Sequence, residues 1–126
     1  MRNHEVTERQ PLLGEDGKIT EPGWSRRAVW EYDRNRIASP AFRIKEWDYY
    51  LVMNEDYGAA FTISDDGYVG LQSVSLLNFK EKWEHTETVL TALPMGRMKM
   101  PASSEEGRTE FRNKRLRMEF RTESGR

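Results

Sequence analysis

The segment Phe42–Asn54, with the sequence FRIKEWDYYLVMN, constrains the fold most strongly, because side-chain character alternates through more than ten positions. In an extended strand, successive side chains point to opposite faces. One face then carries only apolar groups: Trp47, Tyr49, Leu51 and Met53. The other face places acids between apolar neighbours: Ile44, Glu46, Asp48, Tyr50 and Val52. We expect a strand with its bulky rings turned inward. Its second face is either the solvated side of a sheet or the lining of a cavity that uses acid groups.

Turn signals divide the following sequence into an antiparallel meander. Asn54–Gly58 is a predicted turn, and Asp65–Gly67 is the next, where the glycine can adopt the positive φ that tight hairpins need. Strands are predicted at 59–64, 68–79 and 83–93. A helix over 79–93 was the alternative, but Thr86, Thr88 and Val89 favour a strand. In the last segment, 108–123, the apolar parity changes, which predicts a bulge or turn near Asn113–Lys114.

The chain of 126 residues is long enough for one core. Residues 1–40 are predicted to be an extended N-terminal arm with a small hairpin, and 41–126 an antiparallel β domain of about five to seven strands. A turn signal at Glu123–Arg126 has no strand after it. We therefore expect 41–126 to be the N-terminal part of a longer domain, or to complete its sheet with another chain.

Composition excludes several classes of function. Twenty Lys and Arg against 21 Asp and Glu give a net charge of -1, so nucleic acid is not an expected partner. The chain has no cysteine, which excludes disulfides, thiolate catalysis and cysteine-rich zinc sites. A secretory leader and a membrane span are both absent from the sequence pattern, and a cytoplasmic location is the expectation. No motif for a cofactor or a metal appears.

The carboxylates of the organising strand are the candidate catalytic groups. Glu46 and Asp48 share one face, about 7 Å apart by strand rise. In a dry cavity, desolvation and mutual repulsion would make one of them a general acid, with Tyr50 as a third proton-bearing group. Such a set could protonate or hydrate an alkene-like substrate. The alternative, and the commoner cause of such patterns, is a solvated face or ion pairing with the nearby cations Arg34, Arg36, Arg43 and Lys45.

The candidate ligand-binding residues are Trp47, Tyr49 and His85, although aromatic clusters more often pack a core. His85 is the only histidine of the β region, and a half-buried, hydrogen-bonded role is commoner for such a residue than catalysis. His4 is too remote to be a second metal ligand, so no metal site is predicted. The basic tail, residues 105–126, also contains five acids, which favours a solvated strand face over nucleic-acid binding.

Three motifs carry a resemblance to a known family. They are the opening PLLGEDGKITEPGWSRR, the block RIKEWDYYL, and the turn from Asp65 to Tyr68. Together they resemble the uncharacterised family called domain of unknown function 2804, found in bacteria and fungi. The match covers the whole chain and the N-terminal third to half of a longer family domain. The resemblance implies a calycin-like or lipocalin-like antiparallel barrel, here partial, with a hydrophobic cavity, and it implies no established reaction.

Two functions follow as expectations. The first is a lipocalin-like β protein that binds or transforms a small hydrophobic molecule such as a lipid or terpenoid, with Glu46, Asp48 and Tyr50 as its chemistry. The second is a non-catalytic β module that completes its sheet with another domain or chain.

Overall fold

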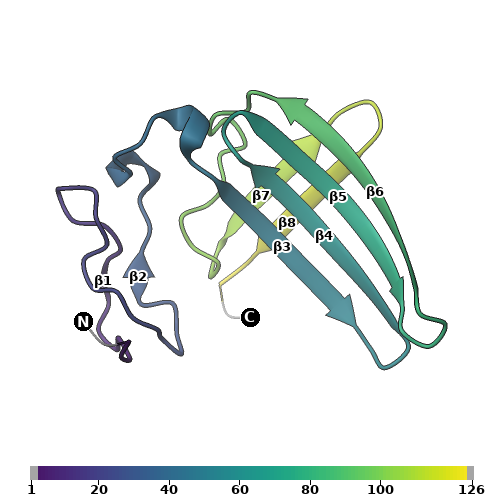
Figure 1. Ribbon diagram of the computed structural model, residues 1–126, viewed down its shortest axis with the longest axis horizontal. Helices are drawn as coiled ribbons and strands as arrows, with labels where there is room; N and C mark the ends of the chain where they lie inside the picture. Colours follow the sequence, from purple (N-terminus) through teal and green to yellow (C-terminus); the bar gives the residue numbers. More distant parts are fainter. Residues whose placement is uncertain (1–2, 125–126) are drawn as a thin grey trace.

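The computed structural model describes residues 3–124, and its main element is an antiparallel sheet in the order β3–β4–β5–β6 (Figure 1). These strands are β3 (Glu46–Met53), β4 (Tyr57–Asp65), β5 (Val69–Asn78) and β6 (Trp83–Ala92). A second hairpin follows, made of β7 (Gly107–Arg112) and β8 (Arg117–Thr122). Before the sheet lie β1 (Gln10–Pro11) and β2 (Trp30–Glu31), a short parallel pair, and two 3₁₀ turns, η1 (Arg34–Arg36) and η2 (Ala41–Arg43).

The prediction of an all-β, antiparallel meander is confirmed, including the strand rather than helix at β6. Each strand of the meander pairs with the next one along the chain, without a bulge in the register. Within residues 3–124, however, the sheet stays open: β3 and β6 are its two edges and do not pair with each other. A closed, calycin-like barrel therefore stays a prediction.

The turn between β4 and β5 is built as the sequence indicated. Gly67 has φ +77°, and a Cβ there would lie 2.4 Å from the carbonyl oxygen of Phe42, so only glycine fits this close approach. The buried carboxylate of Asp65 accepts hydrogen bonds from the backbone N–H of Gly67 at 3.1 Å and of Gly96 at 2.7 Å. One side chain thus holds both the turn and the loop that follows β6.

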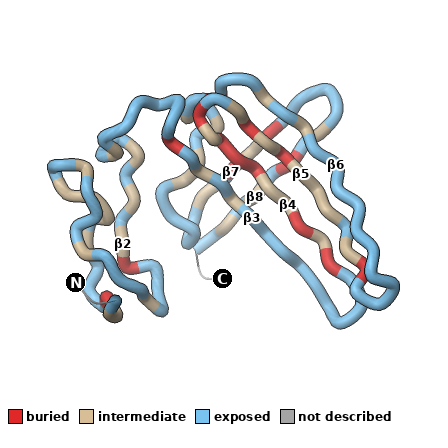
Figure 2. The backbone as a smooth tube through the Cα atoms, viewed as in Figure 1, coloured by how far each residue is buried: buried red, intermediate tan, exposed pale blue. Residues whose placement is uncertain are grey.

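The core lies where the β7–β8 hairpin crosses one face of the sheet. Ile63 of β4 is fully buried against Phe111 of β7 and Met118 of β8. Figure 2 shows the buried residues gathered along β4 and β5, with β3 and β6 largely exposed. The turn between β7 and β8, where the N–H of Asn113 donates to the carbonyl oxygen of Leu116, confirms the predicted change of parity.

The β7–β8 hairpin packs on the face of β3 that carries Glu46 and Asp48. The prediction that the rings of Trp47 and Tyr49 turn inward is therefore wrong. Trp47 is 64% exposed and Tyr49 is 54% exposed. Leu51 and Met53 are exposed on the same outer face. The physical reason is position: β3 is an edge strand, and among residues 3–124 the β7–β8 hairpin packs on the opposite face.

Residues 3–40 form an irregular segment on the β3 side of the sheet (Figure 1). It is held by two isolated bridges, Glu5 with Trp24 in parallel and Leu13 with Ile19 in antiparallel fashion. No helix among residues 3–124 is long and apolar enough to cross a bilayer. The turn signal predicted at Glu123–Arg126 falls partly on 125–126, which lie outside the described residues.

Candidate functional site

The predicted carboxylates lie at a hollow of about 270 Å³ between the start of β3, the segment before it and the loop before β7. Its lining is mixed, with two acids, a lysine and large apolar groups: Tyr32, Lys45, Glu46, Trp47, Asp48, Met100 and Pro101. The hollow therefore brings three of the predicted site residues, Glu46, Trp47 and Asp48, to one place.

Both carboxylate oxygens of Glu46 are already engaged. The Tyr32 hydroxyl donates to Oε1 at 2.5 Å, and Nε of Arg34 donates to Oε2 at 2.8 Å. The Glu46 side chain is only 10% exposed. Burial, and then the hydrogen bond to Glu46, raise the pKa of Tyr32 above its ordinary value, so this phenol stays protonated. Glu46 thus ties the N-terminal segment to the sheet.

The Arg34 guanidinium packs flat on the backbone at Gly96, where a Cβ would lie 2.6 Å from Cζ. This glycine also donates its N–H to Asp65. The ion pair with Glu46 is therefore supported from the loop after β6 as well as from η1. Sequence reasoning named Arg34 among several nearby cations, and the structure selects it as the partner.

Asp48 and Tyr50 point to the hairpin rather than to Glu46. The buried Thr109 of β7 donates its hydroxyl to Oδ2 of Asp48 at 2.5 Å. The Tyr50 ring packs against Phe120 with centroids 4.8 Å apart, and its hydroxyl lies 3.5 Å from Oγ1 of Thr122. The hollow near Glu46 is not lined by Tyr50. The three candidate catalytic side chains share a face, as predicted, but each contacts a different element; their catalytic role stays a prediction.

The predicted ligand-binding residues are far apart in the sheet. Trp47 and Tyr49 project from the outer face at the β3 edge, whereas His85 lies on β6, the opposite edge. The expected half-burial of His85 is wrong: its side chain is 64% exposed, with Nε2 3.1 Å from Oε1 of Glu87. No hollow identified among residues 3–124 joins the three.

The structure adds an apolar hollow that sequence reasoning missed, at the end of the sheet beyond the hairpin; we call it the far-end hollow. Its volume is about 520 Å³, and its nine lining residues carry no charge: Val52, Met53, Asn54, Tyr57, Gly58, Ala59, Leu76, Leu77 and Trp83. The strand register explains the grouping, because Val52, Ala59 and Leu76 are direct cross-strand neighbours. Predicting this hollow requires the pairing register of β3, β4 and β5, and the alternation of side chains along one strand does not give that register.

The free edge of β3 is the second feature that sequence reasoning did not develop. The N–H of Asn54 donates to the carbonyl oxygen of Tyr57 at 2.9 Å, which marks this cross-strand pair as hydrogen-bonded. Because such pairs alternate along an antiparallel ladder, the outer-face residues direct their own N–H and C=O groups away from β4. These residues are Trp47, Tyr49, Leu51 and Met53. Within residues 3–124, no strand pairs with this edge.

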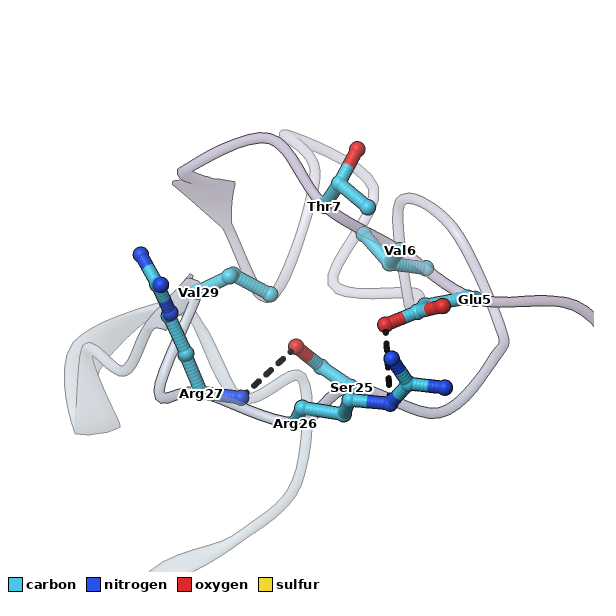
Figure 3. A pocket seen from close by; sticks show the side chains of 7 residues that line it. All are labelled: Glu5, Val6, Thr7, Ser25, Arg26, Arg27 and Val29. Atoms are coloured by element: carbon cyan, nitrogen blue, oxygen red, sulfur yellow. Dashed lines mark hydrogen bonds and ion pairs between the residues drawn. The ribbon is translucent and has the colours of Figure 1, made fainter.

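A third hollow, of about 270 Å³, lies in the N-terminal segment (Figure 3). Its one acid, Glu5, has Nε of Arg26 at 3.6 Å from Oε1. The N–H of Arg27 donates to Oγ of Ser25, while its guanidinium extends away from Glu5. The cations therefore do not converge on a common ligand position. No cluster of three or more histidine or acidic side chains suited to a metal occurs in residues 3–124.

The comparisons with known proteins identify a family and no activity. A family model described as "Domain of unknown function (DUF2804)" matches residues 3–126, which confirms the resemblance carried by the sequence motifs. Neither a curated protein nor a solved structure matches the chain.

Proposed function

The chain belongs to the family described as Domain of unknown function (DUF2804), and because that description names no activity, we propose a function from geometry: a non-catalytic β module that completes its sheet with another domain or chain. The observation that carries this proposal is the free edge of β3, together with its exposed apolar face.

Edge strands of proteins that do not pair are usually blunted by lysine, proline, a bulge or short length. β3 has no lysine, proline or bulge over Glu46–Met53, its two acids lie within its first three residues, and its last five residues, Tyr49–Met53, carry no charge. A row of backbone donors and acceptors beside exposed rings is the surface that strand addition uses. β6, the other edge, carries the exposed acids Glu84 and Glu87 and is less suited to the same role.

The engagement of the acids also supports a structural role. Glu46 accepts two hydrogen bonds and Asp48 accepts one from a buried hydroxyl. Moving either carboxylate towards a substrate would leave these donors unpaired, which costs free energy. The carboxylates thus serve to hold the N-terminal segment and the hairpin against β3.

Site-specific photo-crosslinking in the cells that make the protein tests the proposal. Tyr49 is replaced by benzoylphenylalanine, and the matched control carries the same probe at Thr88, which lies in the same cross-strand row but on β6. We expect position 49 to crosslink to an extended segment of another domain or chain, and position 88 to give little product. Equal yields at the two positions would remove the support for β3 as the pairing edge.

A second candidate function is supported by the far-end hollow, because apolar hollows of roughly 300–1,000 Å³ are typical of small-molecule sites. A lipid or terpenoid would contact Leu76 and Trp83 there. Glu46 and Asp48 lie at the other end of β3, so hydration or isomerisation at Glu46, Asp48 and Tyr50 stays a separate prediction. Titration with farnesol, followed by intrinsic tryptophan fluorescence, to which Trp83 contributes, tests this candidate. Saturable binding that Leu76→Lys abolishes is expected, and unchanged binding by that variant would dismiss the hollow.

A further inference from the structure

We propose that the partner of the β3 edge is a second copy of this chain, paired antiparallel about a two-fold axis that passes between the two Leu51 residues. The inference rests on the proposed function and names its partner. It predicts one continuous sheet of eight strands across two chains, with the order of the meander reversed in the second copy.

The hydrogen-bonding phase of β3 permits this pairing. Leu51 is one of the residues whose N–H and C=O groups point to the free edge, as derived from the Asn54–Tyr57 pair. A two-fold axis beside Leu51 sets it opposite the partner's Leu51, so both residues exchange two hydrogen bonds. The same register sets Tyr49 opposite the partner's Met53. The N–H and C=O groups of both residues also point to the free edge, so this pair can form hydrogen bonds as well.

Charge selects this register among its neighbours. With Leu51 at the centre, Tyr49–Met53 pairs only with itself, and this segment contains no charge. Moving the centre to Tyr50 would place the Asp48 carboxylate opposite the partner's Val52. A charged group would then face an apolar side chain across the strand pair. Moving it to Asp48 would set two carboxylates against each other, which is destabilising. A centre at Leu51 avoids both costs within the paired segment Tyr49–Met53.

The faces also match across the axis. Side chains directly opposite in an antiparallel pair share a face, so Val52 would lie beside the partner's Tyr50. In each chain, Tyr50 packs on Phe120 of the β7–β8 hairpin. The partner's hairpin would therefore lie next to Val52, which lines the far-end hollow. The two-fold arrangement supplies a covering element for the part of the inner face that a single chain leaves exposed.

Large apolar side chains are exposed along the edge that the proposed dimer would pair. Trp47, Tyr49 and Tyr50 are each roughly half exposed, and side chains of this kind bury about 150–250 Å² when covered, so they offer on the order of 300 Å². Leu51, Val52 and Met53 are exposed to a similar degree and raise the total. These side chains alone fall short of the ~800 Å² per partner of a standard interface, and the backbone hydrogen bonds of the paired edges would add to the contact.

Disulfide trapping tests the register directly, because the natural chain has no cysteine. Hydrogen-bonded antiparallel pairs hold their Cα atoms about 5.5 Å apart, within the range that a disulfide spans. Leu51→Cys is therefore expected to form a covalent dimer under mild oxidation at low micromolar concentration. The control, Thr88→Cys, is exposed on the same face at the other edge and should react at least tenfold more slowly. Equal rates would overturn the second-copy proposal.

Sedimentation of the cysteine-free chain gives an independent measurement. We expect a monomer–dimer equilibrium that Leu51→Lys weakens at least tenfold and Thr88→Lys leaves unchanged, with circular dichroism showing that both variants fold. A monomer at all concentrations would overturn the proposal. If position 49 photo-crosslinks to a different protein while Leu51→Cys gives no self-dimer, the second-copy inference fails and the proposed function stands; if neither reacts, both fail.

Discussion

Removal of the Glu46 carboxylate by Glu46→Ala is expected to destabilise the fold by about 2–3 kcal/mol. The carboxylate accepts one bond from Tyr32 and one from the charged Arg34, and a hydrogen bond to a charged group contributes about 1.5–3 kcal/mol. Breaking a fully buried pair costs about 3–5 kcal/mol, but the Arg34 side chain is 29% exposed, so water can replace part of the lost interaction. The matched control is Glu55→Ala in the exposed β3–β4 turn, which should change stability by less than about 0.5 kcal/mol.

Chemical denaturation at neutral pH measures the loss of stability, and ultraviolet titration of the phenols measures its cause. Burial is the largest reason for the raised pKa of Tyr32, and the bond to Glu46 is the second, so the variant should titrate lower than the wild type while staying above the ordinary value. A raised folded pKa contributes stability that is complete below the ordinary tyrosine pKa and is lost as pH rises through the folded value. Glu46→Ala should therefore lose less stability in alkali. An unchanged Tyr32 titration, or a loss no larger than that of Glu55→Ala, would refute the reasoning.

Three further outcomes are expected. Ile63→Ala should cost about 3–4 kcal/mol in denaturant titrations, since Ile63 is fully buried at the hairpin contact, and Ile63→Val only about 1 kcal/mol. Thr109→Val should cost about 1–2 kcal/mol by leaving Asp48 without its donor, and Thr109→Ser should restore most of it. Hydrogen bonds from His4 and then Gln10 lower the pKa of Glu21, so its contribution is present above the ordinary value of 4.5 and is lost as pH falls; Glu21→Gln should flatten the acid side of the thermal melting profile.

The meander could be predicted from sequence because its signals are local. Alternation in 42–54 and the Asp65–Gly67 turn each act within a few residues, and the strands they define pair with their neighbours along the chain. The parity change near Asn113 likewise predicted a bulge or turn, and the structure has the turn of the β7–β8 hairpin there. In each case the residues that specify the element also form it.

The covered face of β3 could not be predicted in this way. Alternation separates Trp47 from Asp48, but both faces of a strand look alike until the element that packs on one of them is known. That element begins at Gly107, and the Glu46 partners come from the other direction, at Tyr32 and Arg34. The far-end hollow could not be predicted either, because its lining comes together only when the register of three strands is known.

The hydrogen bond from Thr109 to Asp48 closes a separation of 61 residues, whereas the meander joins strands that follow one another. Loop-closure entropy delays distant contacts, so the sheet should form before the hairpin docks on it. Until the hairpin docks, the inner face of β3 is exposed to water. The charges of Glu46 and Asp48 then keep this aromatic-rich strand soluble. The two acids would thus reduce aggregation early in folding, and in the folded state they bind the N-terminal segment and the hairpin.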